Sequence, residues 1–106
     1  METVKIFRKK HVPPSEVVML KADINYTEIH FANGTTIVLA KTLKKLQNDF
    51  YPYGFFRINK TNMINLKYLL RTIDDFSHVV LKNRLELNVS RRRREDLKNL
   101  IHQKNA

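Results

Sequence analysis

The sequence predicts a mostly β domain with antiparallel neighbouring strands and two short helices. Three observations predict this class. The 106 residues have a globular composition, with 42% hydrophobic and 28% charged residues. Several short apolar or alternating runs are separated by turn residues, which is typical of antiparallel β structure. Only two segments show the spacing of an amphipathic helix.

Residues 1–15 are predicted to be a basic N-terminal arm or strand, and residues 16–106 the main domain. The arm carries the cluster Lys5, Arg8, Lys9 and Lys10 and ends at Pro13-Pro14. Paired prolines interrupt regular structure and are therefore typical of a boundary. The continuous apolar run at 17–20 then predicts the first strand of the domain.

A hairpin is predicted next. Residues 26–31 alternate between two faces, as expected for a half-buried strand, and residues 35–39 form a second apolar run. Asn33-Gly34 lies between them, and this step favours a type I′ turn with positive φ at both positions.

A short helix is predicted to begin after Thr42, whose hydroxyl suits an N-cap. It ends at the Tyr-Pro-Tyr-Gly segment 51–54. The residues with helical spacing are Leu43, Leu46, Gln47 and Phe50.

The second half of the chain predicts more strands and one closing helix. Ser90 is expected to be the N-cap of that helix, with Leu97, Leu100 and Ile101 on one face. The predicted strands are 55–58, 63–66, 68–73, 79–81 and 85–89.

The net charge of +10 predicts a polyanionic partner, either a nucleic acid or an anionic membrane surface. Residues 82–106 contain eight basic and three acidic residues, so a quarter of the chain carries half of this charge. No apolar segment approaches the roughly 20 residues of a membrane helix. The N-terminus lacks the apolar core of a signal peptide. We therefore expect a cytoplasmic protein that does not enter a membrane.

Catalysis is not expected. The chain has no cysteine, no Gly-rich phosphate loop and no nucleophile-elbow or zinc-protease motif. Its four histidines are scattered, and Asp74-Asp75 are interpreted as turn residues. The sequence predicts a non-enzymatic protein without cofactor or metal.

Three polar segments are candidates for binding. Ser90 is followed by Arg91-Arg92-Arg93-Arg94, expected in the first turn of the last helix, where the helix dipole disfavours cations. Such a run suits phosphates, and one arginine could contact guanine. Asn59-Lys60-Thr61-Asn62 and Asn25-Tyr26-Thr27 also carry groups that reach base edges or phosphates.

Together these segments resemble the LytTR-type DNA-binding domain, the output module of bacterial LytR/AlgR-like response regulators. The resemblance spans roughly residues 16–101. Phe56, Arg57 and Asn65 match the family's middle motif, whereas Asn59-Lys60-Thr61 stand where the family usually has His-Arg-Ser. The segments that carry it are IHFANGTTIVLAKTLKKL at 29–46, FFRINKTNMINL at 55–66 and LNVSRRRREDLKNL at 87–100.

The resemblance implies an elongated antiparallel β-sheet or sandwich domain with two or three short helices. It also implies a bacterial transcriptional regulator of a two-component system that binds specific double-stranded DNA from loops between strands and from the N-terminus of the last helix. It further implies paired direct-repeat sites, a possible homodimer on DNA, and a receiver module that is separate or missing. Arg57 and Asn65 are assigned to structure, Arg57 with a partner within the sheet and Asn65 holding the backbone at a strand end. RNA binding and anionic-membrane binding are the alternatives. The implied DNA contacts are Asn25, Tyr26, Thr27, Asn59, Lys60, Thr61, Ser90, Arg91, Arg92 and Arg94.

Overall fold

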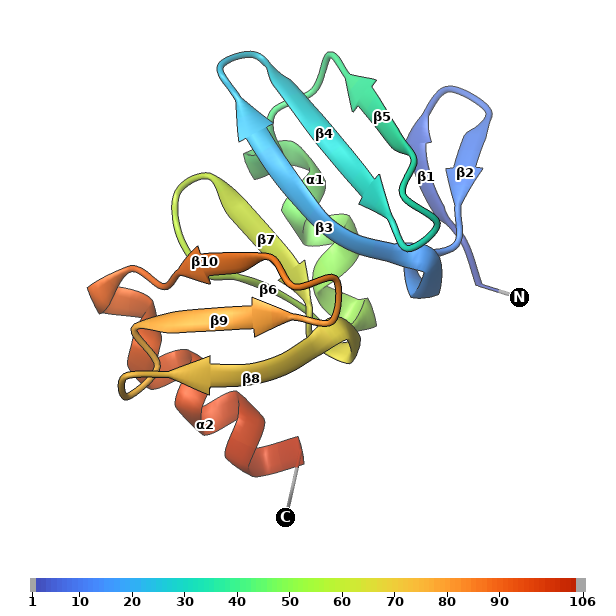
Figure 1. Cartoon of the computed structure of the whole chain (residues 1–106). Coiled ribbons are helices and arrows are strands. Elements are labelled where there is room, and N and C mark those ends of the chain that lie inside the picture. Colours follow the sequence, from blue (N-terminus) through green and yellow to red (C-terminus); the bar gives the residue numbers. More distant parts are fainter. Residues whose placement is uncertain (1, 105–106) are drawn as a thin grey trace.

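Three antiparallel sheets and two α-helices form the structure, so the predicted mostly β class is confirmed (Figure 1). The computed structural model describes residues 2–104. Strands account for 42% of it and helices for 29%. Its principal extents of 40 × 31 × 24 Å make the domain elongated.

The larger sheet has five strands in the order β5-β4-β3-β7-β6. The smaller sheet has the order β10-β9-β8, and β1 pairs with β2 in a separate hairpin. The strands are β1 (Val4–Phe7), β2 (Lys10–Val12), β3 (Val17–Asp23), β4 (Tyr26–Phe31), β5 (Thr36–Leu39), β6 (Phe55–Arg57), β7 (Asn62–Asn65), β8 (Leu69–Ile73), β9 (His78–Leu81) and β10 (Glu86–Asn88). The helices are α1 (Leu43–Phe50) and α2 (Arg94–Lys104).

Most predicted elements are present, with shifted boundaries. Thr42 is the N-cap of α1, because its hydroxyl oxygen accepts a hydrogen bond from the Lys45 amide at 3.4 Å. The strand expected at 68–73 begins only at Leu69, after a 3₁₀ turn over Leu66–Tyr68. Among residues 2–104, no helix is both long and apolar enough to cross a membrane.

Strand β3 separates two hydrophobic cores. A β-bulge between Val17 and Met19 changes which face successive residues occupy, so residues 17–20 are all buried. Val17 and Leu20 belong to a first core formed with α1, whereas Val18 and Met19 belong to a second core formed with the smaller sheet and α2. The continuous apolar run is therefore explained by burial on both faces.

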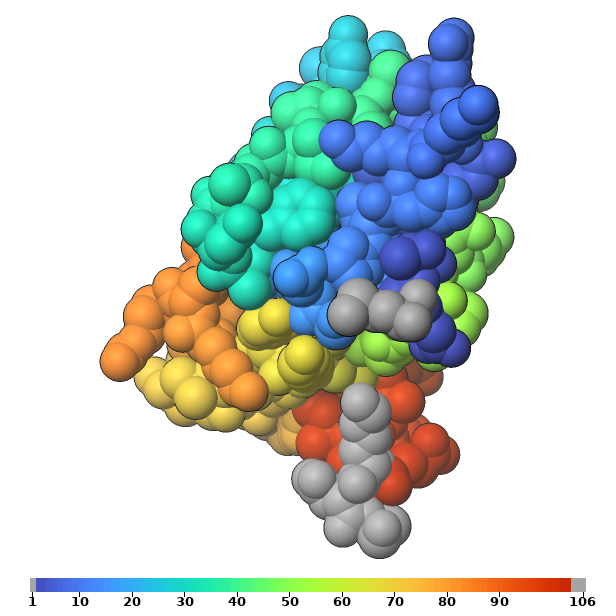
Figure 2. Space-filling model, turned by 90° about the vertical axis from the view of Figure 1, so that its right-hand side faces the viewer, coloured from blue at the N-terminus to red at the C-terminus, as the bar shows by residue number. Residues whose placement is uncertain are grey.

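The predicted N-terminal arm forms the β1–β2 hairpin. Val4, Ile6 and Val12 are buried in the first core, and Figure 2 shows this hairpin against the neighbouring segments of the larger sheet. Its basic tip at residues 8–10 is exposed.

The hairpin at Asn33-Gly34 is confirmed, but the predicted type I′ turn is wrong. Gly34 has φ +92°, whereas Asn33 is not among the residues with positive φ. The Gly34 amide donates to the Phe31 carbonyl at 3.0 Å. This is a type I turn followed by a left-handed residue, the usual three-residue hairpin loop. The Asn33 side chain favours it by accepting from the Thr35 amide at 2.9 Å.

The loop from Leu81 to Leu85 has the same hydrogen bonds, with Arg84 at the position of Gly34 and φ +74°. An L-residue pays about 1–2 kcal/mol for this conformation. We therefore expect Arg84→Gly to raise the free energy of unfolding by about 0.5–1 kcal/mol after the entropy of glycine is subtracted. Urea titration followed by circular dichroism measures this change.

The matched control is Gly34→Ala. A Cβ at Gly34 meets no atom within 4 Å, so its cost is conformational and not steric. We expect it to lower stability by about 1 kcal/mol. If the two substitutions changed the free energy of unfolding equally and in the same direction, the two loops would not share one turn conformation.

Candidate nucleic-acid interface

The β6–β7 loop, residues 58–61, is held from inside by Asn59. Its side-chain oxygen accepts from the Thr61 and Asn62 amides, each at 2.8 Å, and its Nδ2 donates to the Asn88 carbonyl at 2.7 Å. Only 8% of Asn59 is exposed. Both ends of the amide are occupied, so Asn59 is not available to a base, contrary to its predicted role. Its neighbours Lys60 and Thr61 are exposed at the top of the loop.

Arg57 fixes the same loop from the side. Its guanidinium donates to the Lys60 carbonyl at 2.6 Å and to the Gln47 side chain of α1 at 2.9 Å. Burial, and then the positive charge of Arg93, lower the pKa of Arg57 from its ordinary value. Arginine titrates so far above neutrality that the group stays protonated. The expectation of a structural Arg57 holds, although its partners are a loop and a helix and not the sheet.

Asn65 ties strand β7 to the chain before β3, as predicted. Its Nδ2 donates to the Val17 carbonyl at 2.9 Å and to the Pro14 carbonyl at 3.2 Å. It is buried and lies at the end of β7 opposite to the β6–β7 loop. This residue has a structural role.

The segment after β10 differs from its prediction. Arg91–Arg93 form a 3₁₀ turn, η4, and α2 begins only at Arg94, with Glu95 and Asp96 in its first turn. Acidic residues stabilise that position through the helix dipole. Ser90 is the N-cap residue of η4, but its hydroxyl makes no capping hydrogen bond. Three arginines thus precede the helix instead of opposing its dipole.

The four arginines have different surroundings. Arg91 and Arg92 are exposed, while Arg93 donates to the Arg57 carbonyl at 3.2 Å. The Nε of Arg94 donates to the Val89 carbonyl at 3.0 Å, and its side chain lines a separate hollow beside Asp74 and Asp75. Asp74 and Asp75 lie in a turn, as predicted. Arg94 is therefore not gathered with the other candidate contacts.

A basic groove results where the β6–β7 loop meets η4. Its volume is about 540 Å³, and the Ser90 amide joins its two sides by donating to the Ile58 carbonyl at 2.8 Å. We call this the basic groove. Its lining residues are Arg57, Lys60, Ser90, Arg91, Arg92 and Arg93.

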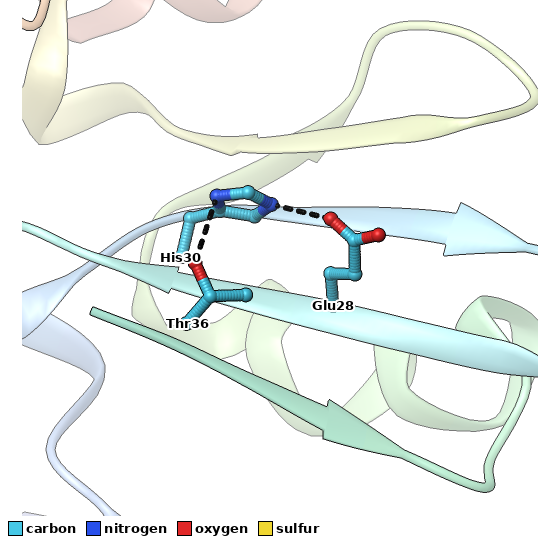
Figure 3. Close-up of polar contacts among 3 residues, drawn as sticks. All are labelled: Glu28, His30 and Thr36. Carbon is cyan, nitrogen blue, oxygen red and sulfur yellow. Dashed lines mark hydrogen bonds and ion pairs between the residues drawn. The ribbon is translucent and has the colours of Figure 1, made fainter. Parts of the chain in front are cut away.

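No ion pair among the described residues neutralises the charge of the groove. In the described part of the chain, no lysine or arginine lies within 4.0 Å of a carboxylate. The carboxylate of Glu28 instead contacts the imidazole of His30 on the same strand, β4, with 2.9 Å between Oε1 and Nε2. The Thr36 hydroxyl lies on the other side of this imidazole (Figure 3). Unpaired cations that converge in a groove attract a polyanion and raise its association rate.

The β3–β4 hairpin is joined to the β6–β7 loop beside the groove. The Ala22 amide donates to the Thr61 carbonyl at 2.7 Å, which connects this hairpin to the β6–β7 loop. Asn25 and Tyr26 are exposed, but Thr27 is fully buried and donates to the Lys41 carbonyl at 2.7 Å. Thr27 is therefore unavailable to a ligand. In Figure 1 the hairpin tip, the β6–β7 loop and the chain after β10 all lie on the left.

Sequence reasoning assigned Arg57 to structure alone, left Arg93 of the arginine run out of the implied contacts, and did not single out Ile24 at the hairpin tip. Arg57 and Arg93 are brought together by packing between segments 36 residues apart, which no local pattern reports. In residues 2–104, no group of three or more side chains is placed to hold a metal ion.

Comparisons with known proteins agree with this architecture. A family profile described as the LytTr DNA-binding domain matches residues 8–102. A similar solved structure is the LytTr DNA-binding domain of a protein described as a methyl-accepting/DNA response regulator from Bacillus cereus. It superposes with a TM-score of 0.74 at 19% sequence identity, covering 94% of each chain. A sequence search among curated proteins finds no match.

Proposed function

Because the chain belongs to the LytTr DNA-binding domain family, we propose that it regulates transcription by binding specific double-stranded DNA through the basic groove and the β3–β4 hairpin tip. The observation that carries the proposal is the groove, where Lys60, Arg91 and Arg92 converge without acidic partners among the described residues. The proposed contacts are Asn25, Tyr26, Lys60, Thr61, Ser90, Arg91 and Arg92. Thr27, Asn59 and Arg94 are left out because the chain itself uses them.

Each group in the proposed set has a distinct chemical role. Arginine can donate two hydrogen bonds to guanine in the major groove, so Arg91 and Arg92 are the candidates for base recognition. Lys60 is a single point charge suited to a phosphate. The hydroxyls of Thr61 and Ser90 can donate to phosphate oxygens, which position a protein without specifying sequence.

Duplex binding measured against salt tests this function, with single-stranded RNA and anionic liposomes as competitors. If the protein makes about 6–10 phosphate contacts, raising the salt concentration from 50 to 200 mM should lower its affinity by roughly 10³–10⁵. The logarithm of the affinity should fall linearly with the logarithm of the salt concentration. Preferential binding to RNA or liposomes would contradict the proposal.

Lys60→Ala is expected to weaken binding to all duplexes alike and to reduce the salt slope by about 1, as for one lost phosphate contact. The measurement is fluorescence anisotropy at four salt concentrations. Lys82→Ala is the matched control, because Lys82 is also exposed but lies in the β9–β10 turn, at the opposite end of β10 from η4. Equal slope changes in the two variants would place the phosphate contact elsewhere.

We further propose that two copies occupy paired direct repeats, either as a homodimer on DNA or side by side. This part rests on the family alone. Sedimentation of the chain with duplexes that carry one or two sites tests it, since a one-to-one complex on both duplexes would contradict pairing.

A further inference from the structure

Ile24 has the most exposed of the large hydrophobic side chains. Its exposure is 90%, compared with 60% for Val38, the next most exposed. Single apolar side chains on a surface are common and need no explanation. Ile24 differs from the others in its backbone conformation and in its position.

The backbone at Ile24 lies in the left-handed region, with φ +46°. Asp23 pairs with Tyr26, so Ile24 and Asn25 are the two central residues of the β3–β4 turn. A positive φ at the first central position is the place for glycine, and a β-branched residue there is an outlier. The chain therefore exposes an apolar side chain and strains its backbone at the same residue. Strain of this kind is typical of functional positions.

The charge around the tip does not favour phosphate binding. Residues 22–35 contain no lysine or arginine, although the net charge of the chain is +10. Asp23 and Glu28 lie on the hairpin instead. An apolar group between acidic residues gains nothing from a phosphate, but it can contact the apolar part of a base edge.

The dimensions of the hairpin favour the major groove. That groove is about 12 Å wide and admits a two-stranded ribbon, whereas the minor groove is about 6 Å wide. The apolar group displayed in the major groove is the thymine 5-methyl. The hydrogen bond from the Ala22 amide places Ala22 beside Thr61 of the β6–β7 loop. Ile24 follows Ala22 by two residues, which corresponds to about 7 Å along the hairpin. The tip would thus meet a base pair beside those reached from the basic groove.

We propose that Ile24 packs against a thymine methyl group in the major groove and determines sequence specificity there. This inference rests on the proposed DNA binding. It assigns the hairpin tip to base recognition by apolar contact, while the basic groove supplies phosphate contacts and contacts to guanine.

The test begins with duplexes selected by the full chain from a random pool. Each thymine of the selected site is replaced in turn by uracil, which removes the methyl group and keeps base pairing. We expect at least one replacement to weaken wild-type binding about fourfold, the transfer value of one buried methyl group. Ile24→Ala should bind the thymine and uracil duplexes equally. Val38→Ala, which alters an exposed apolar residue on β5, should retain the wild-type preference.

Ile24→Gly separates the role in binding from stability. It relieves the positive φ, so we expect a higher urea midpoint together with loss of the thymine preference. The inference would be overturned if no uracil replacement weakened binding, or if Ile24→Ala kept the preference for thymine. Either result would leave the proposed function intact. Loss of DNA bending in Ile24→Ala without a thymine preference would indicate an intercalating wedge and also overturn it. Failure to select any duplex would overturn both proposals.

Discussion

Replacing Arg91 or Arg92 with alanine is expected to produce the largest loss of specific DNA binding. An arginine that donates two hydrogen bonds to guanine contributes about 1–3 kcal/mol of discrimination, which corresponds to a roughly 5- to 150-fold loss of affinity for the selected site. Both side chains are exposed at the basic groove, and no carboxylate among the described residues neutralises them. The effect should be smaller on unrelated duplexes, which offer only phosphates.

Arg71→Ala is the matched control for charge. Arg71 is also exposed, but it lies on β8 outside the basic groove. Affinities for the selected and a scrambled duplex, measured at one salt concentration, separate the two effects. If Arg71→Ala weakens binding as much as Arg91→Ala does, then net charge explains the loss and the groove is not the contact surface.

Asn59→Ala is expected to have the largest effect on stability. It leaves the buried Asn62 amide, the part-buried Thr61 amide and the part-buried Asn88 carbonyl without their partner. Unsatisfied buried groups cost about 1–3 kcal/mol each, and partial relaxation of the loop reduces the sum. We expect a loss of about 2–4 kcal/mol in the free energy of unfolding by urea titration.

Two variants sharpen this prediction. Asn59→Asp keeps the oxygen that accepts from Thr61 and Asn62 but sets a second acceptor against the Asn88 carbonyl, so it should also lose stability because the donor to Asn88 is gone. Lys60→Ala, at the exposed neighbouring position, should leave stability unchanged and alter only binding. If Asn59→Ala instead keeps its stability and changes base preference, Asn59 contacts DNA and the internal role assigned to it fails.

The basic groove depends on contacts between distant segments. Asn59 connects the β6–β7 loop to β10, Arg93 connects η4 to β6, and Ser90 connects η4 to the end of β6. These contacts position Lys60, Arg91 and Arg92 without using their side-chain charges. A rigid framework lowers the entropy that must be lost on binding, which is why such contacts matter to affinity.

Much of the fold could be predicted because its signals are local. Period-two alternation predicted β4, the hydroxyl of Thr42 predicted the start of α1, and the Asn33-Gly34 step predicted a hairpin. The conformations of the turns were harder to predict from the sequence. Asn-Gly favours a type I′ turn in isolation, but the loop here has three residues, and only Gly34 takes positive φ. Arg84 occupies the equivalent position without any sequence signal for it.

By itself, the sequence determined the β class, the excess of positive charge and the three polar segments that resemble a DNA-binding family. The tertiary structure decided which side chains in those segments are free to act. Asn59 and Lys60 are neighbours with polar side chains, yet one is buried in hydrogen bonds and the other is exposed. An amide bonds equally well to a base or to a backbone group, so its chemistry leaves its partner open. The partner of each amide depends on which segments the packing of the two cores brings together.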